Sequence, residues 1–112
     1  MNLQEEDAPI KPWVLIPAFQ PDDKLCALVD ALKDSFPILI VDDGSAGEGC
    51  VDVFARAQAL GAAVIHHRVN LGKGIALKTG IAHIVQLDAD IPGVITADAD
   101  GQHSPADIAR IA

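Results

Sequence analysis

Two aspartates separated by one alanine, Asp98 and Asp100, carry the clearest chemical signal in the sequence. They follow a short apolar segment, 94–97, and precede Gln102. Carboxylate and amide oxygens at such close spacing are the ligands that Mg²⁺ or Mn²⁺ prefers. The pattern therefore predicts a divalent-cation site with Asp98 and Asp100 as ligands, to which Gln102 or His103 could add a third. The alternative is a surface turn in which Asp98 caps the helix that follows.

A second acidic pair, Asp42 and Asp43, follows the apolar run 38–41 and is itself followed by Gly44. Adjacent carboxylates at the end of a buried strand can accept hydrogen bonds from a nucleobase N–H group or from ribose hydroxyls. The alternative is a polar turn in which Gly44 supplies a permissive backbone. The pair alone leaves both interpretations open.

A lysine between two glycines, Gly72-Lys73-Gly74, stands at the start of a predicted helix. Backbone amides at a helix N-terminus, together with a lysine side chain, suit phosphate oxygens. The sequence has no Gly-x-x-x-x-Gly-Lys-Ser/Thr pattern, so a flexible helix start with a solvated lysine is the alternative. His66 and His67 have no metal-ligand spacing to a third partner, and we interpret them as strand-end residues.

The elements that must position these residues alternate along the chain. Short apolar runs predict strands at 13–16, 38–41, 62–65 and 94–97, with Pro17 ending the first strand. Amphipathic spacing and capping residues predict helices at 22–34, 49–60 and 75–86, and a further helix that opens at Ser104-Pro105. Strands that are apolar on both sides indicate an α/β fold, with a mostly parallel sheet covered by helices on both faces.

This fold would bring the polar motifs together, because ligands of such sheets bind at the carboxyl ends of the strands. Each motif above follows a predicted strand, and Pro17 and Ala18 follow the first one, with Phe19 placed to flank a base. A second Asp-Ala-Asp, 88–90, has the same spacing but precedes a strand. We therefore expect 88–90 to be a solvated connection at the opposite edge of the sheet.

Composition narrows the ligand class. The 112 residues include 16 acidic and 8 basic side chains, a formal net charge of −8, and no long basic run. Binding to a nucleic-acid backbone is therefore disfavoured, and an anionic ligand would need a metal ion or backbone amides. Cys26 and Cys50 fit no metal or redox pattern, which indicates a reducing compartment. The acidic N-terminus and short apolar runs predict a cytoplasmic location.

Taken in order, four segments resemble a family 2 glycosyltransferase of the GT-A fold: 14–19, 40–45, 70–74 and 98–105. The form Asp-Ala-Asp-Gly-Gln-His is most similar to the polyprenyl-phosphate mannosyl- and glucosyltransferase branch. The resemblance implies a Rossmann-like nucleotide-binding half at residues 12–112, preceded by a flexible tail at 1–11. A full GT-A domain is about twice as long, so we expect a truncated, donor-binding half.

The resemblance also implies roles for individual residues. The backbone of Pro17 and Ala18 would line the base, and Asp43 together with Asp42 would contact the base and ribose. A second group would lie near the nucleotide and its metal: Gly72, Lys73 and Gly74 beside the nucleotide, Asp98 facing ribose or metal, and Asp100 and Gln102 on Mg²⁺ or Mn²⁺. No residue can be assigned as the catalytic base. Where the family often has Tyr-Asn-Glu, this chain has Phe19-Gln20-Pro21.

The implied activity is transfer of a hexose from a UDP- or GDP-sugar to a lipid-phosphate or saccharide acceptor, at the inner face of a membrane in the full-length protein. One alternative is a non-catalytic interaction module or inactive half-domain, whose exposed sheet edge would favour a homodimer. Another is a nucleotidyltransferase. That class usually has a glycine- and arginine-rich loop after the first strand, and residues 17–23 contain none.

Overall fold

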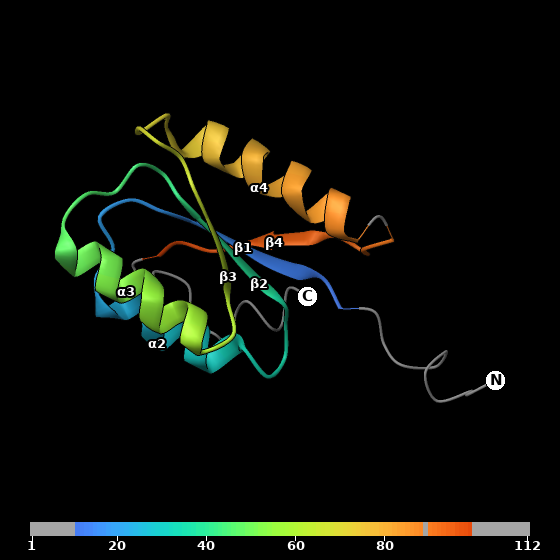
Figure 1. Cartoon of the computed structure of the whole chain (residues 1–112). Helices are drawn as coiled ribbons and strands as arrows, with labels where there is room; N and C mark the ends of the chain where they lie inside the picture. Colours follow the sequence, from blue (N-terminus) through green and yellow to red (C-terminus); the bar gives the residue numbers. More distant parts are fainter. Residues whose placement is uncertain (1–10, 89, 100–112) are drawn as a thin grey trace.

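The computed structural model describes residues 11–88 and 90–99 (Figure 1). Its elements are β1 (Trp13–Ala18), α2 (Asp23–Leu32), β2 (Ile38–Asp42), α3 (Glu48–Ala59), β3 (Ala63–His66), α4 (Lys73–Leu87) and β4 (Val94–Thr96). This is the predicted alternation of strands and helices, with ends that differ by one to a few residues. The helix predicted from Ser104, and the predicted tail apart from Lys11, lie outside the described residues.

The four strands form one parallel sheet in the order β3-β2-β1-β4. Strands β2 and β3 lie on one side of β1, and the chain then crosses over so that β4 pairs with the other side of β1. Such a reversal of strand order opens a crevice at the carboxyl ends of the two strands where it occurs, and ligands of α/β sheets bind there. In this chain those strands are β1 and β4.

Helices cover both faces of the sheet, as the sequence predicts. Figure 1 shows α4 on one face and α2 and α3 on the other. Successive residues of β1 pack into different cores: Ile16 joins the cluster under α2 and α3, and Leu15 joins the cluster under α4. This alternation explains why the strands are apolar throughout. In the described part of the chain no helix is both long and apolar enough to cross a membrane.

The prediction that Pro17 ends the first strand is wrong, because β1 continues through Pro17 to Ala18. Proline lacks the N–H that a strand interior normally donates. In this sheet Leu15 bonds toward β4, where its carbonyl accepts from the Ala97 amide at 3.1 Å, and Pro17 faces the same side two residues later. The β1–β4 pairing ends at Leu15 and Thr96. The missing N–H therefore interrupts no ladder within the described residues.

The boundaries of two helices also have local causes. Asp22 caps α2, since its side chain accepts a hydrogen bond from the Lys24 amide. This confirms the predicted capping role of an aspartate at the start of the helix. Helix α4 begins at Lys73 rather than at residue 75, directly after Gly72, whose φ of +98° places it outside the helix. Lys73 is thereby the first residue of a helix and not part of a longer loop.

The two cysteines are free thiols, as expected from their spacing. Cys26 is buried in the core under α2 and α3, and Cys50 is half-buried. Burial raises the pKa of the Cys26 thiol above its ordinary value, and the opposing effect of the nearby Arg56 charge is smaller. Cys26 is thus a small apolar core residue in this fold.

Candidate functional site

A pocket of about 300 Å³ opens at the carboxyl ends of the strands. Its lining comes from the end of β1, the end of β2, the loop before α4 and the segment after β4: Pro17, Ala18, Phe19, Asp43, Asn70, Gly72, Lys73 and Asp98. Seven of these, all except Asn70, are residues for which the sequence predicts a ligand contact. The structure does not bring Asp42 or Gly74 to this pocket.

Asp43 is the buried polar centre of the pocket wall, with 4% of its surface exposed. Its Oδ1 accepts hydrogen bonds from His67 Nδ1 and from the Leu71 amide, both at 2.9 Å, and its Oδ2 accepts one from the Gly72 amide at 2.9 Å. His67 Nε2 lies 2.9 Å from Thr79 Oγ1 on α4. Asp43 therefore ties the loop before α4 to the end of β2.

The environment of Asp43 keeps its carboxylate ionised. Burial by itself would raise the pKa of this group. The hydrogen bonds from His67, Leu71 and Gly72 outweigh burial, and the pKa falls below its ordinary value of 3.8. A carboxylate fixed in this way is a preoriented acceptor for an N–H or O–H donor in the pocket.

Gly44 allows the loop before α4 to lie directly against the end of β2. Its φ is +79°, and a Cβ atom at this position would collide with the backbone of Val69 and Asn70. Only glycine meets both requirements, the left-handed backbone and the close approach. Gly44 thus helps to bring Asn70 to the pocket wall.

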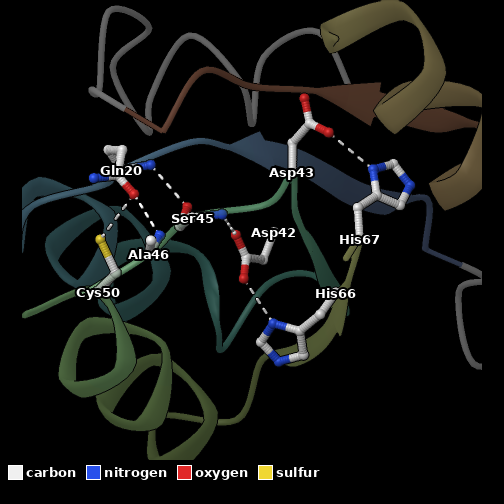
Figure 2. A network of polar contacts seen from close by, with 8 residues as sticks. All are labelled: Gln20, Asp42, Asp43, Ser45, Ala46, Cys50, His66 and His67. Carbon is white, nitrogen blue, oxygen red and sulfur yellow. Dashed lines mark hydrogen bonds and ion pairs between the residues drawn. The ribbon is translucent and has the colours of Figure 1, made fainter. Parts of the chain in front are cut away.

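Asp42 lies on the other side of the sheet from Asp43, because successive side chains of a strand point to opposite faces. Its Oδ1 accepts from the Ser45 amide at 2.9 Å, and its Oδ2 lies 2.7 Å from His66 Nδ1 (Figure 2). Asp42 lines a separate hollow beside α3. The Asp42 side chain holds the loop after β2 through the Ser45 amide. It does not line the pocket in which Asp43 is predicted to contact a base.

Lys73 and Asp98 form an ion pair at the pocket, with Nζ and Oδ1 3.0 Å apart. The Lys73 side chain is 64% exposed and that of Asp98 is 28% exposed. Exposed pairs of this kind contribute about 0–1 kcal/mol. The lysine can therefore exchange Asp98 for another anion at little cost.

The predicted metal ligands are only partly within the described residues. Asp98 lies in the pocket wall, whereas Asp100 and Gln102 lie outside the described residues. Among residues 11–88 and 90–99, no three His, Cys, Asp or Glu side chains converge as a metal-binding group. Asp98 nevertheless offers a carboxylate at the pocket, which is the ligand chemistry of a hard divalent cation.

The second Asp-Ala-Asp segment behaves as a connection, as predicted. Asp88 is the C-cap residue that follows α4, Asp90 is exposed, and the Asp90 amide donates to Asp88 Oδ1 at 3.3 Å. The segment precedes β4 and so lies at the opposite end of this strand from Asp98.

Sequence reasoning missed the partners of the two aspartates. His66 and His67 are interpreted above only as strand-end residues, but each lies against one aspartate. The parallel register pairs Asp42 with His66, and the next residue of each segment then faces the other side. Knowledge of the register, together with side-chain alternation, would have found both pairs. Asn70 gave no signal of its own.

The strand order and the pocket at its reversal are typical of nucleotide-binding α/β proteins. The family model described as glycosyl transferase family 2 matches residues 13–112. The chain therefore belongs to glycosyl transferase family 2, a family of enzymes, and the resemblance found in its motifs is confirmed.

Three relatives are similar to this chain, and the names of two of them describe transfer of a sugar to a lipid phosphate. An uncharacterized protein of Methanocaldococcus jannaschii is 35% identical over 101 residues, which cover 88% of this chain and 39% of the relative. The UDP-N-acetylglucosamine–dolichyl-phosphate N-acetylglucosaminyltransferase of Methanococcus voltae is 30% identical over 115 residues, 88% of this chain and 45% of the relative. The undecaprenyl-phosphate 4-deoxy-4-formamido-L-arabinose transferase of Sodalis glossinidius is 32% identical over 108 residues, 88% of this chain and 31% of the relative. The chain thus spans less than half the length of these relatives.

Proposed function

We propose that this chain forms the donor-binding part of a glycosyltransferase that transfers a hexose from a UDP- or GDP-sugar to a lipid phosphate. The observation that carries the proposal is the convergence of seven predicted ligand residues in one pocket of a family 2 chain. The names of two relatives include dolichyl phosphate and undecaprenyl phosphate, which supports a lipid-phosphate acceptor over a saccharide.

The pocket residues suggest how the nucleotide is held. The ionised Asp43 would accept a hydrogen bond from the base or ribose, next to the backbone of Pro17 and Ala18. Phe19 is 55% exposed and would flank the base. Lys73, at the N-terminus of α4, would turn from Asp98 to the diphosphate, where the helix dipole also favours negative charge.

A divalent cation is the proposed cofactor, with Asp98 as a ligand and Asp100 and Gln102 as the others. The cation would neutralise the diphosphate leaving group, which a chain with net charge −8 otherwise repels. Asp98 adjoins Lys73 in the same wall, so cation and lysine would share the phosphate charge.

The acceptor also defines where the enzyme would work. A polyprenyl phosphate is held in a membrane by its hydrocarbon chain, and its phosphate lies at the surface. We therefore propose that the complete enzyme acts at the inner face of a membrane, with this pocket open to the cytoplasmic nucleotide sugar.

Calorimetric titration with UDP and GDP, each with and without Mn²⁺, tests the proposal. We expect one of the two nucleotides to bind and Mn²⁺ to increase its affinity. An Asp98→Asn variant should lose the Mn²⁺ effect, whereas Asp90→Asn, from the exposed segment of the same spacing, should keep it. Equal behaviour of the two variants would refute the metal assignment.

Absence of binding in a folded sample would refute the donor-binding proposal and favour the interaction module. Light scattering on the same sample separates these outcomes further. A monomer that binds nucleotide contradicts the interaction module, and a stable dimer without nucleotide binding supports it.

A further inference from the structure

Gln20, in the loop after β1, has an unusual backbone conformation. Its φ is +51°, and no other non-glycine residue in the described ranges has a positive φ. The left-handed region is unfavourable for a residue with a Cβ atom. Strained backbone of this kind persists where the surroundings fix it, and it is concentrated at ligand sites.

Three polar contacts fix Gln20 (Figure 2). Its backbone N–H donates to Ser45 Oγ at 2.8 Å, and its Oε1 accepts from the Ala46 amide at 2.6 Å. The Cys50 thiol donates to the same Oε1 at 3.6 Å. Since all three partners belong to the segment after β2, Gln20 joins the loops that follow two neighbouring strands. We call these contacts the Gln20 clasp.

Asp42, at the end of β2, supports the Gln20 clasp through Ser45. It accepts a hydrogen bond from the Ser45 amide, and this orients the residue whose hydroxyl receives the Gln20 amide. Asp42 is itself buried and bonded to His66. A chain of contacts therefore runs from the sheet to Gln20, and every link is a hydrogen bond between described residues.

The clasp lies next to Phe19, the aromatic residue in the lining of the pocket. Phe19 precedes Gln20 and lines the pocket, with 55% of its surface exposed. It belongs to neither of the two core clusters among the described residues. The side chain of Gln20 takes the other direction, toward Ala46 and Cys50. The hydrogen bond from the Gln20 N–H to Ser45 Oγ fixes the peptide plane that joins Phe19 to Gln20.

We infer that Gln20 is a positioning residue that holds Phe19 against the planar base of a bound nucleotide, and this inference rests on the proposed function. Gln20 itself touches neither base nor phosphate. It contributes to affinity by removing the freedom that the Phe19 segment would otherwise lose on binding. Its effect is therefore confined to ligands that carry a base.

The test compares UDP, GDP and inorganic pyrophosphate as calorimetric probes of the wild-type chain and of Gln20→Ala. We expect Gln20→Ala to weaken the nucleotide that binds by about five- to ten-fold, and to leave the affinity for pyrophosphate within about two-fold. Gln20→Glu keeps an acceptor oxygen for Ala46 and should restore most of the affinity. Gln86→Ala, an exposed glutamine on α4, is the matched control and should bind as wild type.

A double variant separates positioning from a general structural effect. If Gln20 acts through Phe19, then Phe19→Ala with Gln20→Ala binds no more weakly than Phe19→Ala alone. Additive losses, an equal loss of nucleotide and pyrophosphate, or unchanged binding by Gln20→Ala would each overturn the inference while the proposed function stands. Failure of the wild-type chain to bind either nucleotide refutes the proposed function and, with it, the role of Gln20.

Amide hydrogen exchange tests the clasp without any ligand and covers the case in which Gln20→Ala does not fold. The Gln20 and Ala46 amides of the wild-type chain should exchange slowly despite their exposed location. Ser45→Ala, which removes only the acceptor of the Gln20 amide, should accelerate exchange at Gln20 and weaken nucleotide binding in parallel. Fast exchange at both amides in the wild-type chain would show that the clasp does not form.

Discussion

The two adjacent Asp–His pairs at the end of β2 have the same chemistry and different surroundings. In the pair on the α4 side, the side chains of His67 and Asp43 are 9% and 5% exposed. In the pair on the α3 side, those of His66 and Asp42 are 55% and 8% exposed. Asp43 of the buried pair bonds to the loop before α4 and lines the pocket, whereas Asp42 of the open pair supports the loop after β2. One step along a strand is enough to separate a residue of the pocket from a residue that supports a loop.

The largest effect is expected at Gly44, where the loop before α4 approaches β2. Gly44→Ala combines a positive φ with a collision against the backbone of Val69 and Asn70, and should lower the free energy of unfolding by about 3 kcal/mol. Gly47→Ala is the matched control, since Gly47 also has a positive φ but no atom near its Cβ direction. It should cost about 1–2 kcal/mol, from its backbone conformation alone. Urea denaturation measures both, and equal losses would mean that the close approach does not exist.

Removal of each histidine compares the pairs directly. His67→Ala deletes two part-buried hydrogen bonds and should cost about 2 kcal/mol of unfolding free energy. His66→Ala removes an exposed partner of Asp42 and an edge-on contact with Phe54, and should cost about 0.5–1 kcal/mol. The same urea experiment decides, and a larger loss for His66→Ala would reverse the comparison.

We expect acid to lower the free energy of unfolding, because Asp43 becomes protonated. Because its pKa is lowered in the folded state, Asp43 adds stability above its ordinary pKa of 3.8, and this contribution is lost as the pH falls through the folded value. The wild-type chain should therefore lose more stability than Asp43→Asn between pH 7 and pH 3. Chemical denaturation at several pH values measures this, with Asp90→Asn as an exposed control that should follow the wild type. Parallel curves for wild type and Asp43→Asn would contradict the ionised, hydrogen-bonded state.

The smallest effect on stability is expected for Lys73→Ala, since its ion pair with Asp98 is exposed. The unfolding free energy should change by less than about 0.5 kcal/mol, while the affinity for nucleoside diphosphate should fall by about ten-fold. Lys78→Ala, an exposed lysine on the same helix, is the control. A large stability loss with unchanged affinity would make Lys73 a structural residue.

The sequence predicted the elements and their order well because the signal is local. An apolar run between polar turns, as in Ile38–Asp42, needs no knowledge of the rest of the chain. The position of Pro17 within β1 was beyond such reasoning, because it depends on which edge of the strand β4 covers and where that pairing stops. The same holds for the partition of Asp42 and Asp43, which follows from register and not from residue type.

The sequence predicted which residues lie at the candidate site better than it predicted the hydrogen bonds between them. The carboxyl ends of parallel strands must meet, so Ala18, Asp43 and Asp98 could be grouped from the sequence. Hydrogen bonds between distant segments could not be read in this way. Gln20 gave only a departure from the family pattern, and its conformation depends on Ser45 and Ala46 in another loop.

Because β1 lies between β2 and β4, its place in the sheet affects the order in which the sheet assembles during synthesis. Trp13 pairs with Val94, so β1 leaves the ribosome well before β4, and its second edge stays uncovered until β4 has been made. Strands β1, β2 and β3 can assemble with their helices in the meantime, whereas a long loop must close before β4 can dock. Asp98 follows β4 and lines the pocket, which is therefore the last part of the described chain to be completed during synthesis.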